Sequence, residues 1–223
     1  MSEEPIMSQG TEKEAVLANR LVLYTAAARL FAEEPNEQLL DALASQDLID
    51  QVDFFDDDAT SSAWTALMAA AEGTQSIGTL QSEFTVVMIG PDKLPASPWE
   101  STYLEKGGVI FQETTRKVRN DYAAAGFVSS DQRMPDDHIA IELNFIAALA
   151  KKSLEACTND DEILLVSTLN QQQSFIDEHL IKWIPSFAQR LSEAEYDSPF
   201  YKSAARFAEA IIIKDIDLLN ELL

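Results

Sequence analysis

The chain has 223 residues, of which 46% are hydrophobic, and its 38 acidic and 16 basic residues give a formal net charge of −22. This composition excludes an intrinsically disordered chain. The charge repels phosphate, so nucleic acid is not an expected partner; it would attract a basic peptide or a cationic patch on another protein.

Only seven residues are glycine, whereas sheet proteins and nucleotide-binding loops need many more. Alanine, leucine, glutamate and glutamine fill the long stretches between them, which favours an all-α protein. Cys157 is the only cysteine, so a disulfide framework and a cysteine-based zinc cluster are excluded. The N-terminus is acidic and has no apolar core, so we expect no signal peptide. We also expect no membrane span.

Apolar residues at three- and four-residue spacing predict a first helix from about Thr11 to Ala32, preceded by a flexible tail of residues 1–10. Further helices are expected over 37–43, 48–52, 61–72 and 80–89, with a solvated acidic run at 53–59. Residues 90–111 contain three prolines and three glycines, which predicts an ordered loop.

Helix is expected again over 113–125, from Pro135 to about Ala156, over 160–182 and 184–194, and from residue 200 to the end. Pro135 suits the first position of its helix, and Asp136 and Asp137 complement the helix dipole. A break near residues 72–79 separates two halves, but neither looks self-sufficient. We therefore interpret residues 1–223 as a single-domain, all-α, multi-helix bundle.

His138 and Glu142 lie one turn apart, in the middle of the apolar face of the helix expected after Pro135. A buried polar pair is costly unless each member has a partner. Two interpretations stay open: a His–Glu hydrogen bond that satisfies itself in the core, or a groove in which Asp137, His138 and Glu142 meet a ligand.

Metal binding and catalysis have little support in the sequence. The only histidine besides His138 is His179, so a metal site at His138 and Glu142 would need a distant third ligand. No activated-serine motif is present, and a Cys157–His179 pair would need proximity in the fold. We predict no catalytic residues, no metal and no cofactor.

The loop sequence Ser-Pro-Trp-Glu-Ser-Thr-Tyr places Trp99 and Tyr103 one turn apart, beside Glu100. Rigid aromatic side chains in proline-rich loops often make binding surfaces, because they bury a large area at a small entropic cost. Trp99 could equally fill the core beneath the loop, and composition does not decide between the two.

Three segments in order resemble the TorD/DmsD/NarJ family of cytoplasmic chaperones for molybdopterin oxidoreductases exported by the twin-arginine route. They are GPDKLPASPWESTYL with DYAAAGF, then PDDHIAIELNFIAALA, then FIDEHLIKWIPSFAQRL with SPFYKSAARFAEAI. The resemblance runs from the Tyr24 helix almost to the end of the chain, and the loop is nearer to the TorD and DmsD branches. One departure is Asp136, which keeps an extra carboxylate in the Asp-His motif.

The resemblance implies a cytoplasmic, all-helical chaperone without enzymatic activity. Its partners would be the twin-arginine signal peptide and the apo-form of a molybdopterin oxidoreductase, held back until the cofactor is inserted. Carried over by motif, the signal-peptide site would contain Pro98, Trp99, Glu100, Ser101, Tyr103, Asp137, His138, Glu142 and Tyr24.

Two alternatives remain. The chain could be an acidic helical adaptor that binds a basic protein through surface charge, or a helical hydrolase using His138 with Asp137 or Glu142. The client enzyme is not named by the sequence, and a monomer and a domain-swapped dimer are both compatible with it.

Overall fold

The computed structural model describes residues 9–74, 76–90, 93–107, 113–129 and 134–223. The described part of the chain consists of helices joined by turns and loops, with one isolated β-bridge. The predicted all-α class is confirmed. The predicted flexible tail lies outside the described residues, except for Gln9 and Gly10, which already belong to the first helix.

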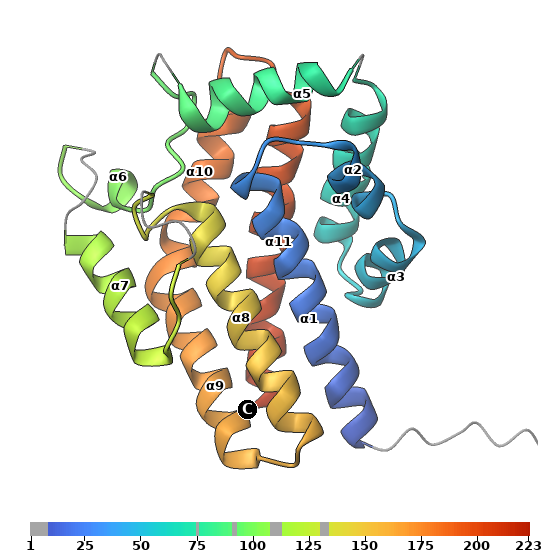
Figure 1. Cartoon of the computed structure of the whole chain (residues 1–223), viewed down its shortest axis with the longest axis vertical. Coiled ribbons are helices and arrows are strands. Elements are labelled where there is room, and N and C mark those ends of the chain that lie inside the picture. The colour runs from blue at the N-terminus through green and yellow to red at the C-terminus, as the bar shows by residue number, and fades with distance from the viewer. Residues whose placement is uncertain (1–8, 75, 91–92, 108–112, 130–133) are drawn as a thin grey trace, which may run out of the picture.

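Four long helical segments form the central bundle (Figure 1). They are α1 (Gln9–Ala32), α8 (Ile139–Thr158), the α9–α10 segment and α11 (Pro199–Leu222). In the third, α9 (Glu162–Phe175), a π-helical turn (Ile176–Leu180) and α10 (Ile181–Glu193) follow without a break. Helix α8 packs against α1 and α9, and α11 packs against α10.

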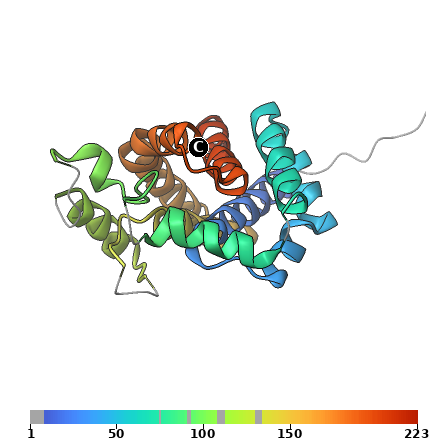
Figure 2. The same cartoon turned by 90° about the horizontal axis from the view of Figure 1, so that it is seen from above.

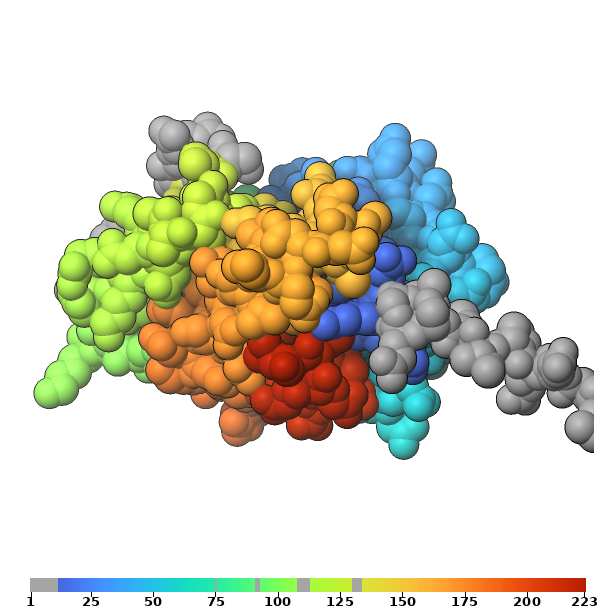
Figure 3. All heavy atoms as spheres, turned by 90° about the horizontal axis from the view of Figure 1, so that it is seen from below, coloured from blue at the N-terminus to red at the C-terminus, as the bar shows by residue number. Residues whose placement is uncertain are grey.

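Shorter helices cover two flanks of the bundle (Figure 2). One flank holds α2 (Glu37–Leu43), α3 (Gln46–Phe54) and α4 (Asp58–Glu72), and the other holds α6 (Ser101–Leu104) and α7 (Glu113–Ala125). Helix α5 (Ile77–Phe84), with a π-helical turn at Thr85–Ile89, crosses one end. At the opposite end, the α8–α9 turn lies beside the last turns of α11 and the first turns of α1 (Figure 3).

One hydrophobic core runs through the bundle, from Leu17 on α1 to Leu219 on α11. Its largest fully buried side chains include Trp183, Tyr24, Phe145 and Phe187. The stretch Glu12–Ala32 of α1 is long and apolar enough to cross a membrane by length and composition alone. However, 56% of its most apolar window is buried inside the fold, as expected of a core helix.

Most predicted helices are present, and three boundaries differ for identifiable reasons. Helix α4 begins at Asp58 because the Asp57 side chain accepts from the Thr60 amide and caps it. Helix α8 begins at Ile139, four residues later than expected, because His138 is its N-cap residue in extended conformation. The expected break near residue 183 is absent, since α10 continues through Pro185.

Candidate peptide-binding site

The loop before α6 is fastened to the start of α8 by a short antiparallel bridge between Trp99 and His138. The Glu100 amide donates to the Asp137 carbonyl at 3.0 Å, and the Ile139 amide donates to the Pro98 carbonyl at 2.9 Å. These bonds join the two motifs that the sequence singled out. Residues about 40 positions apart therefore form one structural unit, the loop–α8 junction.

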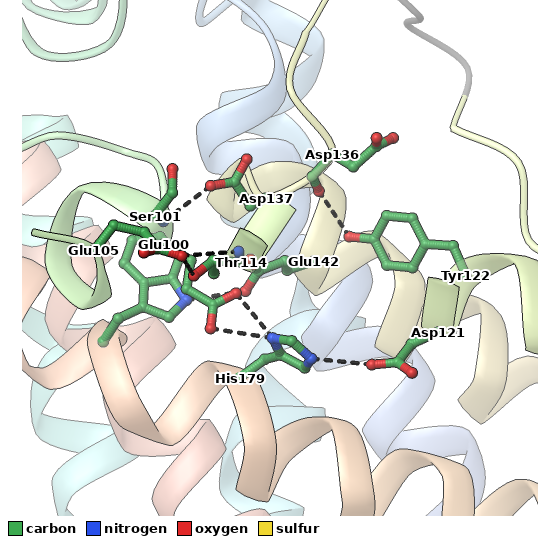
Figure 4. A network of polar contacts seen from close by, with 11 residues as sticks. Glu100, Ser101, Glu105, Thr114, Asp121, Tyr122, Asp136, Asp137, Glu142 and His179 are labelled. Carbon is green, nitrogen blue, oxygen red and sulfur yellow. Dashed lines mark hydrogen bonds and ion pairs between the residues drawn. The ribbon is translucent and has the colours of Figure 1, made fainter. Parts of the chain in front are cut away.

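Asp137 holds the loop through a hydrogen bond to its backbone. Its Oδ2 atom accepts from the Ser101 amide at 2.9 Å, at the first residue of α6 (Figure 4). Both residues are fully buried. A carboxylate at a helix N-terminus satisfies an amide that has no partner within the helix, so Asp137 stabilises the conformation of the loop.

His138 is buried and neutral. Its Nδ1 atom accepts from the Ala140 amide at 3.2 Å, and its ring meets Trp99 edge to face with centroids 5.6 Å apart. Burial lowers the pKa of His138 to about 4. The internal pairing with Glu142, one of the two interpretations that the sequence left open, is not what the structure shows, because the Glu142 carboxyl group accepts from Trp183 Nε1 at 2.9 Å.

Glu100 and Glu142 are both fully buried in the same cluster. Burial and the charge of the neighbouring Glu100 raise the pKa of Glu142 well above its ordinary value. Burial also raises the pKa of Glu100, although its bonds with His179 act in the opposite direction. Glu142 therefore keeps its proton more readily than an ordinary glutamate does.

His179 joins the loop to α7 (Figure 4). Its Nδ1 atom lies 2.9 Å from Glu100 Oε2, and its Nε2 atom lies 3.0 Å from Asp121 Oδ2. Burial alone would lower the pKa of His179, but its hydrogen bonds and charge interactions with Glu100 and Asp121 raise it above its ordinary value. The charged imidazolium is thereby favoured between two carboxylates.

The two aromatic residues of the loop are only half-buried. The Tyr103 hydroxyl donates to the Ser97 carbonyl at 2.8 Å, its ring packs 5.4 Å from Trp183, and the Arg190 guanidinium lies 4.3 Å above it. Asp136 is also partly accessible and pairs with Arg119 at 2.6 Å. Trp99, Tyr103 and Asp136 form the accessible surface of the junction.

Tyr24 lies in a different cluster. Its hydroxyl donates to Asp215 on α11 at 2.8 Å, and the same carboxylate pairs with Arg20. All three side chains are essentially inaccessible. Of the nine predicted site residues, eight therefore meet at the loop–α8 junction, and Tyr24 joins α1 to α11.

Four buried polar atoms at the junction have no hydrogen-bond partner among the described residues. They are Trp99 Nε1, Ser101 Oγ, Asp137 Oδ1 and Glu142 Oε1. An unsatisfied buried polar atom costs about 1–3 kcal/mol, so such atoms gather where water or a ligand supplies the missing bonds. The junction combines apolar rings with unused donors and acceptors. The described residues contain no cluster of three or more His, Cys, Asp or Glu side chains suited to a metal ion.

Asp121, His179 and Trp183 were missed as members of this cluster. The signal in the sequence is that His179 and Trp183 are four residues apart and so share one helix face. Two buried glutamates also require partners. A π-helical turn contains His179, and such turns frequently mark functional sites.

The fold is similar to that in the crystal structure of a putative redox enzyme maturation protein from Archaeoglobus fulgidus. The two share a TM-score of 0.51 and 18% identity over 95% of this chain and 99% of that one. This similarity defines the class of fold.

A family model described as Nitrate reductase delta subunit matches residues 55–189. The chain therefore belongs to this family, which is the TorD/DmsD/NarJ family that its motifs resemble.

The curated relatives named Chaperone protein TorD include two from Vibrio species. The one from Vibrio cholerae serotype O1 (strain El Tor Inaba N16961) is 33% identical over 64% of this chain, and the match spans 63% of its length, less than two thirds. The one from Vibrio vulnificus (strain YJ016) is 29% identical over 93% of this chain and 98% of its own length.

Proposed function

We propose that this protein is a cytoplasmic maturation chaperone without catalytic activity. It binds the twin-arginine signal peptide of a molybdopterin oxidoreductase and holds the enzyme until its cofactor is inserted and folding is complete. The observation that carries the proposal is the loop–α8 junction, where both motifs of the family meet around unpartnered polar atoms. The names of the relatives support the same function.

The junction contains accessible residues that contact the peptide and buried residues that hold the loop in place. Trp99 and Tyr103 offer apolar area to the hydrophobic part of the peptide, and Asp136 offers an accessible carboxylate to an arginine, in place of Arg119. Pro98, Glu100, Ser101, Asp137, His138 and Glu142 are buried, so they act by holding the loop in its binding conformation. Tyr24 acts further away, by holding α1 on α11.

Calorimetry with the leader peptides of candidate client enzymes tests the proposal. We expect Trp99→Ala to weaken binding by about 2 kcal/mol, or about thirtyfold, because a central aromatic anchor is lost. Asp137→Ala should also weaken binding, since it releases the Ser101 amide. Phe54→Ala is the matched control, because Phe54 is 49% exposed on α3, on the other flank of the bundle.

Replacing the arginine pair of the peptide by glutamine should weaken binding to the native protein. Unchanged affinity in both Trp99→Ala and Asp137→Ala, with helical content preserved, would place the peptide site elsewhere. The acidic adaptor is not favoured by the relatives' names, and it predicts that Trp99→Ala has no effect.

A further inference from the structure

A small cavity lies between α7 and α9, beside the Asp121 carboxylate that contacts His179. Its volume is about 100 Å³, and its lining includes Asp121 from α7, Phe145 from α8, and Gln171, Ser174 and Phe175 from α9. One water needs only ~10–15 Å³ of such space, so the cavity has room for a larger group.

The cavity lining offers several hydrogen-bond acceptors. Asp121 brings a carboxylate, and Gln171 Oε1 is buried without a partner among the described residues. The Ser174 hydroxyl donates to Glu178 at 3.2 Å, which leaves its lone pairs to accept. No Lys or Arg is among the described residues that line the cavity. A group that carries positive charge and donates hydrogen bonds therefore suits this lining.

The remaining walls are aromatic. The rings of Phe145 and Phe175 lie 4.8 Å apart, edge to face, and only a small part of each ring is accessible from the cavity. A planar guanidinium suits both kinds of wall, because it donates several hydrogen bonds in its plane and is weakly hydrated, so its faces can lie against apolar atoms. An ammonium group donates as well, but it is more strongly hydrated, so contact with apolar walls costs it more.

We propose that this cavity binds the guanidinium group of an arginine side chain, held by hydrogen bonds to Asp121 and Gln171 and lying against the apolar wall that includes Phe145 and Phe175. That the arginine belongs to the leader peptide of a client rests on the function proposed above. The cavity itself is a second contact point, separate from Trp99 and Tyr103.

The position of the cavity also couples it to the loop. Asp121 Oδ2 lies 3.0 Å from His179 Nε2, and His179 Nδ1 lies 2.9 Å from Glu100. A bound arginine would therefore share Asp121 with the imidazole that anchors Glu100, the residue directly after Trp99. Occupation of the cavity and the conformation of the loop therefore both depend on the contacts among Asp121, His179 and Glu100.

Titration of the full chain with N-acetylarginine methylamide tests the cavity directly, with two-dimensional ¹H–¹⁵N NMR as the readout. We expect saturable shifts of the Gln171 side-chain amide and of the Ala124 and Ala125 backbone amides. N-acetylcitrulline methylamide has nearly the same shape but no charge, so its effect should be much weaker. Equal responses to the two probes would overturn the proposal, as would a response to neither, which means water alone fills the cavity.

Two variants and a matched control sharpen the test. Gln171→Leu removes the unpartnered acceptor and should weaken arginine binding about tenfold. Gln173→Leu makes the same change on the same helix, where the amide bonds Asn220 instead, and should leave binding unchanged. If Gln171→Leu does not fold, Asp121→Asn should weaken arginine binding while leaving citrulline binding alone. Unchanged arginine affinity in a folded Gln171→Leu protein would contradict the proposal.

The link to the client is tested separately, with leader peptides in which each arginine in turn is replaced by glutamine. One of these two replacements should lower the affinity of the leader for the native protein but not for the Gln171→Leu protein. If the leader binds but neither replacement is coupled to Gln171, the cavity is not its arginine site and the chaperone function stands. If no leader binds while the arginine probe does, the proposed function fails and the cavity stands.

Discussion

Glu142 is a fully buried carboxyl group beside a second buried carboxyl, Glu100. Its pKa is raised when the protein folds, so the folded state holds the proton more tightly than the unfolded state. The resulting stabilisation is complete below about pH 4.5 and is lost as the pH rises through the folded pKa. The stability of the native protein should therefore fall with pH on account of this residue.

Glu142→Gln removes that dependence, because an amide keeps the shape and has no proton to lose. We expect the free energy of unfolding of the variant, relative to the native protein, to rise between about pH 5 and about pH 8. Urea unfolding at several pH values measures it. Glu155→Gln, at an exposed position on the same helix, is the control. A constant difference between Glu142→Gln and the native protein across this range would contradict the interpretation.

His179 holds the buried Glu100 carboxylate in place, so His179→Gln should leave that charge without its main partner. Breaking a buried ion pair from one side costs about 3–5 kcal/mol, and we expect a loss near the lower end. The stabilisation by His179 is complete below about pH 6.5 and declines as the pH rises through its raised folded pKa.

Hydrogen exchange separates this role from a general loss of stability. The amides of Glu100 and Ile139 form hydrogen bonds across the loop–α8 junction. Relative to the native protein, His179→Gln should accelerate the exchange of these two amides more than the exchange of amides in the middle of α11. Asp177→Asn changes an exposed acid in the same π-helical turn and should not alter exchange. Uniform acceleration across the protein would show that His179 does not act through the loop.

At the level of elements, α1 and α11 are joined by the buried cluster of Arg20, Tyr24 and Asp215. Tyr24→Phe removes one hydrogen bond to a buried carboxylate and should cost about 1.5–3 kcal/mol. Peptide affinity should not change in conditions where the variant is folded, because Tyr24 does not contact the loop–α8 junction through its hydroxyl.

Tyr201→Phe is the matched control for Tyr24→Phe. Tyr201 is also fully buried, on α11, but its hydroxyl has no partner among the described residues. Removing that hydroxyl should be neutral or stabilising, since an unsatisfied polar group leaves the core. Thermal unfolding compares the two variants, and calorimetry with a leader peptide measures affinity. A specific loss of affinity in Tyr24→Phe would place Tyr24 in the peptide site.

The helices could be predicted from local signals, and the irregular positions could not. Periodic apolar residues predict α1, and α7 ends at Ala125 as expected, directly before Gly126 with its φ of +73°. The π-helical turn around His179 has no comparable local signal. Helix α8 begins later than the expected Pro135 because His138 is extended and forms the bridge to Trp99, a contact between residues distant in sequence.

The motifs predicted which residues meet at the loop–α8 junction better than they predicted which of them are accessible. The two motifs identify residues such as Trp99 and Asp137, and the structure brings them together. The apolar face of α8 indicates burial for His138 and Glu142, and both are buried. The sequence also left open a groove in which the carboxylates of Asp137 and Glu142 meet a ligand, whereas both are fully buried. The burial of Asp137 depends on how the loop folds over α8, and the periodicity of one helix does not contain that information.

At the level of the whole molecule, the net charge of −22 attracts a cationic peptide over long distances. This attraction weakens with salt, because the screening length falls from about 10 Å at 0.1 M to about 3 Å at 1 M. Apolar contact with Trp99 is not screened in this way. Binding of a leader peptide should therefore weaken with salt and then level off at a residual affinity.

Two variants should separate these contributions. Trp99→Ala should lower affinity by a similar factor at every salt concentration, giving a line parallel to that of the native protein. Asp136→Asn removes an accessible charge next to the junction, so its affinity should be lower at low salt and converge with the native value at high salt. Calorimetry between about 0.05 M and about 1 M salt measures both lines. If binding of the native protein disappears at moderate salt and Trp99→Ala has no effect, the surface charge alone holds the partner, and the molecule is an adaptor without a specific peptide site.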